Sequence, residues 1–258
     1  MKIKVLGSSG GEKRGVKLSS FLIDETLLLD AGSVTQVLKM EEQLKIKYVL
    51  LTHAHFDHIK DLPLLVDNLV TYYFSSAQLT VFSLREVIQA LKKHIFNDEI
   101  WPDFTIIPPE NPVLKLEEIL PEATFFIGKY RITPFLTKHT VPSTGYFIEK
   151  DNRSLFYSGD TGTFPDLWRK ISALKPDVVI TEISFPDHLK ELASISGHYT
   201  PDLFFRDLSC LHNSCKIFIF HIKPVYSKQI EQEVNDFLRK FPSFPEVKIL
   251  KDNEEIII

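Results

Sequence analysis

The 258-residue sequence has little of several features that would fix its class at once. It has only two cysteines, Cys210 and Cys215, and their spacing matches neither a paired-cysteine zinc knuckle nor a disulfide framework, so we expect both to be reduced. Its apolar runs stay well short of the roughly 20 residues that a membrane-spanning helix needs, which argues against a membrane protein. With 30 basic and 34 acidic residues, the chain has no basic excess with which to grip a long nucleic acid.

The composition is otherwise that of an ordinary globular protein. Hydrophobic residues make up 44% of the chain and charged residues 25%, which argues against disorder. Residues 1–7 turn into glycines too early for a secretory signal, so we expect a cytoplasmic location. Because no stretch rich in proline, glycine or serine divides the chain, we predict a single domain over residues 1–258 that acts on a small substrate.

Short apolar runs bounded by glycine, aspartate and serine predict strands in both halves of the chain. In the first half these runs are residues 2–6, 20–23, 27–29 and 48–52. In the second half they are residues 130–137, 145–149, 154–158, 178–183 and 216–221. Strands followed by helical patterns, twice over, predict an α/β fold in which two sheets lie between helices as a four-layer αββα sandwich.

The stretch of about residues 76–125 is predicted to be an insertion that overhangs the active site. Residues 84–96 show helical periodicity, and an irregular, aromatic-rich segment follows them. The candidates in this stretch for binding a substrate base are Phe96, Asn97, Trp101 and Phe104. An equally open interpretation is that the aromatic side chains only pack the insertion onto the core. Apolar surface around residues 84–104 is also a candidate interface for a homodimer.

Residues 53–58 read His-Ala-His-Phe-Asp-His and place four potential metal ligands directly after an apolar strand. Imidazoles and a carboxylate at this density suit zinc, iron or manganese, whereas calcium and magnesium favour oxygen donors. Residues two apart on an extended segment point the same way, which aims His53 and His55 at one ion. Asp57 and His58 lie past the turn, where a helical pattern begins, and so address a different point. The motif therefore predicts two neighbouring divalent ions.

Three further polar residues come directly after apolar strands, where side chains from different strands can converge. They are His139, Asp160 and His221. One such residue alone would usually have a structural role. Three of them beside the first motif predict the ligands that complete a metal site.

His198 lies just before a predicted helix start, in which Thr200 is the N-cap and Pro201 the first helical residue. The helix dipole would lower the pKa of His198. The carboxylate of Glu182, at the end of the preceding strand, would raise that pKa and hold one tautomer. A histidine tuned in this way is a candidate general acid, and the alternative is a histidine that only braces the turn.

These residues, taken in order along nearly the whole chain, resemble the metallo-β-lactamase superfamily. The matching positions are Asp30 in Leu-Leu-Asp-Ala-Gly, the motif at 53–58, His139, Asp160 in Ser-Gly-Asp-Thr-Gly, and His221. The resemblance implies that Asp30 orients a ligand without touching metal. It implies one metal bound by His53, His55, His139 and Asp160, and a second bound by Asp57, His58, His221 and the bridging Asp160.

Shorter segments resemble the class II 3',5'-cyclic-nucleotide phosphodiesterases. These segments are residues 96–97, 101–103, 181–185, 196–201 and 221–224. The chain departs from that family's first motif at Phe56 and Asp61, although the metal positions are untouched. The resemblance implies hydrolysis of 3',5'-cyclic AMP or GMP to the nucleoside 5'-monophosphate by a metal-bridging hydroxide that Asp57 orients. His198, supported by Glu182, would be the acid that protonates the departing ribose oxygen.

Three other functions stay open at this point. The tRNA 3'-end-processing endonucleases share the implied fold, metals and Glu–His pair, but their long basic arm is not visible here and Thr181 stands where they carry a histidine. A thioester or lactone hydrolase would not need the pair of Glu182 and His198. A degenerate family member with an interaction role should have lost ligands, whereas all seven positions are filled. The sequence does not choose between adenine and guanine, or among zinc, manganese and iron.

Overall fold

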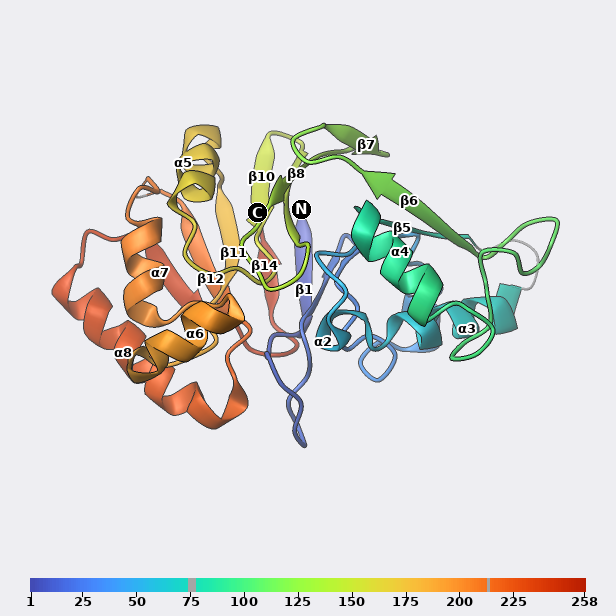
Figure 1. The fold of residues 1–258 in the computed structure, drawn as a ribbon. Coiled ribbons are helices and arrows are strands. Elements are labelled where there is room, and N and C mark those ends of the chain that lie inside the picture. Colours follow the sequence, from blue (N-terminus) through green and yellow to red (C-terminus); the bar gives the residue numbers. More distant parts are fainter. Residues whose placement is uncertain (74–77, 213) are drawn as a thin grey trace.

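A computed structural model describes residues 1–73, 78–212 and 214–258 of the chain. Two seven-stranded mixed sheets form the centre of the molecule, with helices on the outer side of each (Figure 1). In Figure 1, α2, α3 and α4 lie on one side of the strands and α5 to α8 on the other. The predicted αββα sandwich is therefore confirmed. Within the described part of the chain, no helix is both long enough and apolar enough to span a membrane.

The two sheets divide the chain between its halves, except that the last strand returns to the first sheet. The first sheet has the order β14-β1-β2-β3-β4-β5-β6 and the second has the order β13-β12-β11-β10-β9-β8-β7. The strands of the first sheet are β1 (Lys2–Gly7), β2 (Ser20–Ile23), β3 (Leu27–Leu29), β4 (Tyr48–Leu50), β5 (Leu79–Leu84), β6 (Leu114–Ile119) and β14 (Glu255–Ile257). Those of the second are β7 (Phe125–Ile127), β8 (Tyr130–Leu136), β9 (Thr144–Lys150), β10 (Arg153–Tyr157), β11 (Val178–Glu182), β12 (Lys216–Phe220) and β13 (Glu246–Ile249).

Helices connect many of these strands and cover the outer faces of the sheets. The α-helices are α1 (Met40–Gln43), α2 (Phe56–Ile59), α3 (Leu62–Tyr73), α4 (Arg85–His94), α5 (Pro165–Leu174), α6 (Lys190–Ser196), α7 (Pro201–Leu208) and α8 (Ser227–Lys240). Two 3-10 turns, η1 (Asp187–Leu189) and η2 (Pro224–Tyr226), complete the set.

Burial on both faces explains why the central strands read as continuous apolar runs. Successive side chains of a strand point to opposite faces of the sheet. In β11, Val178 and Ile180 join the hydrophobic core that both sheets share, whereas Val179 packs in the second core, with residues of α5, α7 and α8. Both faces of such a strand are therefore apolar, as is usual for parallel strands between two layers.

Parallel pairing brings the polar residues after several strands to one edge of the molecule. β3 pairs in parallel with β4, and β11 pairs in parallel with both β10 and β12. The carboxyl ends of parallel strands meet at the same edge of a sheet. Asp30, Asp160 and His221 follow β3, β10 and β12 in this way, so the fold positions them for a common site.

The stretch expected as an insertion at about 76–125 contributes two strands to the first sheet and a helix that packs on them. Its residues 76 and 77 lie outside the described part of the chain. β5 pairs in parallel with β4, and β6 pairs in parallel with β5. α4 contacts both new strands and buries Val87, Ile88 and Leu91. The stretch therefore forms an integral edge of the sheet.

Candidate metal centre

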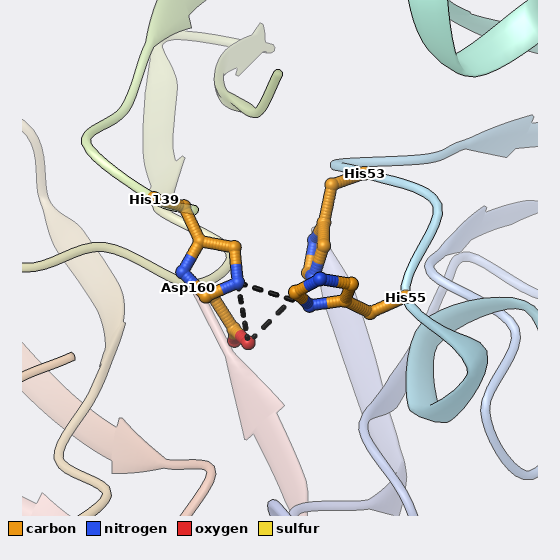
Figure 2. Close-up of side chains that lie close together, drawn as sticks. All are labelled: His53, His55, His139 and Asp160. Atoms are coloured by element: carbon orange, nitrogen blue, oxygen red, sulfur yellow. Dashed lines mark hydrogen bonds and ion pairs between the residues drawn. The ribbon is translucent and has the colours of Figure 1, made fainter. Parts of the chain in front are cut away.

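Seven histidine and aspartate side chains converge at the edge of the sheets where these strands end. They form two groups, the first with His53, His55, His139 and Asp160, and the second with Asp57, His58 and His221. Within each group, the atoms that could bind metal lie within 4.8 Å of one another. Figure 2 shows the first group, in which imidazoles from two separate loops point toward the carboxylate of Asp160. The structure thus brings together the seven residues that the sequence nominated as ligands.

The carboxylate of Asp160 lies between the two groups. Its Oδ1 lies 3.3 Å from Nε2 of His58 and its Oδ2 lies 3.3 Å from Nε2 of His221. Toward the first group, the same Oδ2 lies 3.7 Å from Nε2 of His53 and 3.9 Å from Nε2 of His139. Asp160 therefore contacts members of both groups, which is the geometry of a shared ligand.

Asp30 holds His58 through the ring nitrogen that faces away from the cluster. The Nδ1 of His58 lies 2.8 Å from Oδ2 of Asp30, and the hydroxyl of Tyr157 donates to the same oxygen at 2.6 Å. The backbone N–H of Thr52 donates to the other oxygen at 2.8 Å. Since a carboxylate only accepts, His58 donates from Nδ1, and Nε2 is the ring nitrogen that faces the cluster. Asp30 thus orients a candidate ligand without belonging to either group.

Two other histidines are fixed in the same tautomer. The Nδ1 of His139 donates to the backbone oxygen of Gly197 at 3.0 Å, since a carbonyl can only accept. The hydroxyl of Thr52 donates to Asp30, so its oxygen accepts from Nδ1 of His53 at 2.9 Å. Both histidines therefore point an unprotonated Nε2 at Asp160. The outer partners select the nitrogen that is able to bind a metal.

Several atoms of the cluster are buried but have no hydrogen bond to any residue that the structure describes. These atoms are Nε2 of His53, Nε2 of His58 and Oδ1 of Asp160. Leaving such groups unsatisfied is costly, and native proteins rarely do it without a reason. A divalent cation would satisfy all three atoms, because neutral imidazole nitrogens and carboxylate oxygens are its usual ligands. The residues present therefore fit divalent metal binding.

The electrostatics of the cluster fit the same conclusion. Burial, together with His58, holds the pKa of His53 well below its usual range, so this ring is neutral. Burial would raise the pKa of the Asp160 carboxyl, but His221 and His58 hold it well below its usual range. Burial would lower the pKa of His58, but the carboxylates of Asp160 and Asp30 raise it well above its usual value. The negative potential of these two carboxylates also attracts a divalent cation.

The backbone around the cluster is strained at two of these positions. Asp30 and His221 have φ angles of 53° and 64°, a left-handed conformation that non-glycine residues rarely adopt. Such strain concentrates at functional sites. Gly197 has a φ of 69°, and a Cβ there would lie 3.0 Å from Cα of His139, so only glycine brings its carbonyl this close.

Glu182 and His198 form the pair that the sequence predicted. The Nδ1 of His198 donates to Oε1 of Glu182 at 2.6 Å. Burial would lower the pKa of His198, but the charge and hydrogen bond of Glu182 raise it above its ordinary value, which favours the protonated ring. A ring nitrogen of His198 also lies within 4.8 Å of candidate ligand atoms of Asp160 and His221. The pair therefore stands beside the metal ligands. Pro201 begins α7 as predicted, although the Thr200 side chain makes no cap hydrogen bond.

The aromatic segment does not offer the base-binding surface that the sequence suggested. Phe96 and Phe104 are only 1% and 3% exposed and pack in the core that the two sheets share. Asn97 caps its own loop, because its Oδ1 accepts from the N–H groups of Glu99 and Ile100. Trp101 is partly buried and packs against the same core. The interpretation that these side chains pack the segment onto the core is the one that the structure favours.

Four residues that support the cluster were missed in the sequence. Thr52, Tyr157 and Gly197 orient His53, Asp30 and His139 through the contacts described above. The fourth is Ser184, whose hydroxyl contacts Glu182 at 2.7 Å and His221 at 2.8 Å. A threonine before a ligand motif or a serine two residues after Glu182 is too common a pattern to stand out. Their contacts join residues far apart in the chain.

Comparison with known proteins places this site in a family. A family model described as a beta-lactamase superfamily domain matches residues 26–222. A probable 3',5'-cyclic-nucleotide phosphodiesterase of Yersinia pestis is 24% identical over 206 residues, which cover 69% of this chain and 57% of that protein. A ribonuclease Z of Metallosphaera sedula is 27% identical over 169 residues, which cover 60% of this chain and 51% of that protein. The chain thus spans a little over half the length of these relatives.

Comparison with solved structures shows that the fold is shared over the whole chain. Unliganded yeast PDE1 superimposes with a TM-score of 0.86 at 18% identity, over 100% of this chain and 99% of that one. At that identity the likeness shows the shared fold. The family match, by contrast, covers most of the sequence and includes every residue of the two ligand groups. On these grounds the chain belongs to the metallo-β-lactamase superfamily.

Proposed function

We propose that the chain is a metal-dependent phosphodiesterase that hydrolyses 3',5'-cyclic nucleotides, cyclic AMP or GMP, to nucleoside 5'-monophosphates. The observation that carries the proposal is the pair of Glu182 and His198 beside the ligand groups. A thioester hydrolase releases a thiolate, which leaves without a proton, whereas a ribose oxygen that leaves a phosphodiester needs a proton donor. The relative from Yersinia pestis, named as a probable cyclic-nucleotide phosphodiesterase, supports this substrate class.

In this proposal two divalent ions, of zinc, manganese or iron, occupy the two groups and share Asp160. His53, His55 and His139 would hold one ion, and Asp57, His58 and His221 the other. Bound divalent ions activate water and neutralise the charge that grows on a phosphoryl group during attack.

The side chains divide the remaining work between Asp57 and His198. Asp57 has a 27% exposed side chain, whereas those of Asp160, His139 and His221 are at most 2% exposed. In this proposal water and substrate reach the cluster on the side of Asp57, whose carboxylate would accept a hydrogen bond from the attacking water and orient it. His198, with its Nδ1–H bound to Glu182, would donate the proton on Nε2 to the 3' oxygen as the ester bond breaks.

A second candidate is an RNA-processing endonuclease, because ribonuclease Z of Metallosphaera sedula is among the relatives. Such an enzyme would use the same ligand groups and the same acid pair. The net charge of -4 disfavours it, since binding a long RNA calls for a basic surface. Thr181, beside Glu182, also stands where the resemblance to those nucleases implies a histidine.

The test is a substrate panel measured on the wild-type protein loaded with manganese or with zinc. It contains 3',5'-cyclic AMP, 3',5'-cyclic GMP, a tRNA precursor and a bis-aryl phosphate, with products separated by chromatography. We expect turnover of at least one cyclic nucleotide and release of the 5'-monophosphate alone. Cleavage of the tRNA precursor without cyclic-nucleotide turnover would overturn the proposal in favour of the second candidate.

A further inference from the structure

Ser184 stands where the acid pair meets the metal ligands. It follows β11 two residues after Glu182 and is fully buried. Its Oγ lies 2.7 Å from Oε2 of Glu182, 2.8 Å from Nδ1 of His221 and 3.2 Å from Nδ1 of His198. One hydroxyl therefore contacts a candidate ligand, the candidate acid and the carboxylate that orients that acid.

The direction of these hydrogen bonds follows from the single hydrogen of the hydroxyl. Glu182 can only accept, so Ser184 donates to it, and the serine oxygen is left to accept from Nδ1–H of His221. His198 donates its own Nδ1–H to Oε1 of Glu182, at the shorter distance of 2.6 Å. The contact between Ser184 and His198 is therefore secondary. The hydrogen bonds thus run from His221 to Ser184 and from Ser184 to Oε2 of Glu182. The other oxygen of Glu182, Oε1, accepts from His198.

These hydrogen bonds hold Nδ1 of His221, so that its Nε2 faces the cluster. With Nδ1 donating to Ser184, Nε2 faces the cluster at 3.3 Å from Oδ2 of Asp57 and at 3.3 Å from Oδ2 of Asp160, and in the neutral ring it would carry the electron pair for a metal. An electron pair that faces two carboxylate oxygens is unfavourable unless a positive charge lies among them. The same hydroxyl fixes one oxygen of Glu182, so that the other stays in line with His198.

We propose that Ser184 is a positioning residue that couples metal binding at Asp57, His58 and His221 to the orientation of Glu182 and His198. The role in metal binding depends on the two ligand groups alone. The role toward the acid rests on the proposed phosphodiesterase function. The coupling needs no intermediate residue, because the Ser184 hydroxyl contacts both the ligand His221 and the acid pair directly.

The backbone around Ser184 argues against a role that is only structural. Its N–H donates to the oxygen of Tyr199 at 3.1 Å, and its carbonyl accepts from the N–H of Lys223 at 3.3 Å. These bonds hold the turn after β11 without the hydroxyl, which also lies 3.2 Å from the backbone oxygen of His221 but donates to Glu182 at the shorter distance of 2.7 Å. Removal of the hydroxyl should therefore leave the turn in place and change the ring of His221 and the carboxylate of Glu182.

The test compares Ser184→Ala with Ser184→Thr, which keeps a hydroxyl, and with Ser83→Ala. Ser83 is a matched control, because it is also fully buried and its hydroxyl donates to a backbone carbonyl, that of Leu51, at 2.7 Å. Manganese and zinc affinity are measured on metal-stripped protein by competition with a chromophoric chelator. Thermal melting of each variant checks the fold, and kcat and KM for cyclic AMP are measured on fully loaded protein.

We expect Ser184→Ala to weaken the binding of one of two metal equivalents by roughly 10- to 100-fold, as is usual when a partner of a ligating histidine is lost. Its kcat should fall at saturating metal while KM changes little. Ser184→Thr should recover most of the metal affinity, and Ser83→Ala should leave it unchanged. A folded Ser184→Ala protein with wild-type affinity for both equivalents would overturn the proposal.

Two further outcomes keep the inference separate from the proposed function. If Ser184→Ala melts far below the wild type, its metal affinity does not decide the question, and Ser184→Thr becomes the deciding variant. A folded Ser184→Thr protein with metal affinity well below that of the wild type would then overturn the proposal. If the wild type does not cleave cyclic nucleotides but Ser184→Ala still loses one metal equivalent, the proposed function fails and the positioning of His221 stands.

Discussion

The two halves of the molecule supply the site in different ways. The first half supplies four candidate ligands from one contiguous stretch, His53 to His58, which follows β4 and continues into α2. The second half supplies His139, Asp160 and His221 from the ends of separate strands, and adds Glu182 and His198. In the first half a local motif sets the geometry, whereas in the second half the register of the sheet sets it.

This difference predicts a division of labour between the halves. Ligands of the first half are held by supports from their own half, Asp30 and Thr52. Apart from Asp57, which would also orient the attacking water, we expect them to serve metal binding alone. The second half carries the shared ligand Asp160 and the acid pair. Substitutions of the acid pair should therefore affect proton transfer apart from metal binding, whereas substitutions of the ligands and their supports should affect metal binding. Three predictions test this separation, and a fourth concerns a contact that joins the halves.

The largest effect is expected from Asp160→Asn, because Asp160 contacts both ligand groups. Loss of its charge should weaken binding of both metal equivalents and lower phosphodiesterase activity by on the order of 10³-fold or more. Metal content by atomic absorption and activity are measured on the same preparation. Loss of only one equivalent would show that Asp160 is not shared.

A smaller effect is expected from Glu182→Gln, which removes the charge behind His198 but leaves its side chain volume. We expect kcat for cyclic AMP to fall on the order of 10²-fold, since a misplaced or less protonated acid loses much of its effect. The metal content should stay within a few-fold of the wild type. Glu233→Gln is the control, because Glu233 bonds Asp187 and Gln229 away from the cluster. Metal loss equal to that of Asp160→Asn would erase the proposed division between the halves.

Asp30→Asn should act on metal binding alone. An amide is a weaker acceptor for Nδ1–H of His58, so we expect affinity for one metal equivalent to fall about 10- to 100-fold, with near-normal kcat at saturating metal. Asp61→Asn is the matched control, because Asp61 is also buried but accepts from Val34 and Thr35. If excess metal does not restore kcat, Asp30 has a role beyond orienting His58.

The smallest effect concerns a contact that joins the halves far from the site. Asp24, in the turn between β2 and β3, accepts from Tyr130 at 2.8 Å and from Lys150 at 2.7 Å, both on strands of the second sheet. Burial would raise the pKa of Asp24, but the hydrogen bond from Lys150 lowers it below its ordinary value of 3.8. Asp24→Asn should therefore lower the free energy of unfolding at pH 7, by at most about 1 kcal/mol because the group is partly exposed.

The sign of this effect with pH follows from the lowered pKa. The folded protein favours the ionised carboxylate, so its contribution is present above pH 3.8 and is lost as the pH falls through the folded pKa. Denaturant unfolding at several pH values should show the difference between wild type and Asp24→Asn shrinking toward acid. Glu25→Gln, which removes an exposed partner of Lys45, serves as the control. A difference that grows toward acid would contradict the argument.

The sequence was sufficient for the parts of this molecule that local patterns encode. Apolar runs predicted β1 to β4 and most strands of the second sheet, and the motif at 53–58 predicted the convergence of ligands. β5 was not recognised as a strand, because it has no alternating pattern and Thr80 and Ser83 interrupt its apolar run. β14 pairs with β1 across nearly the whole length of the chain, and no local signal reports such a pairing.

Side-chain roles were harder to predict where only tertiary packing decides them. Phe96 and Phe104 were candidates for base stacking, yet an aromatic ring has the same sequence signature in a core as in a pocket. Ser184 was missed for the opposite reason, since a small polar residue gains its role only when β11 and β12 lie side by side. Predictions from sequence were therefore strongest for ligands and weakest for the residues that hold them.

The most direct test of the account compares two substrates in the wild type and in His198→Ala, with metal content measured on both proteins. Cyclic AMP has a poor leaving group that needs a proton, whereas bis(p-nitrophenyl) phosphate has a leaving group that departs without one. We predict that His198→Ala retains its metal, loses roughly 10²- to 10⁴-fold in turnover of cyclic AMP, and keeps most of its turnover of the aryl diester. Equal losses on both substrates, or loss of metal, would contradict the role of His198 as the acid.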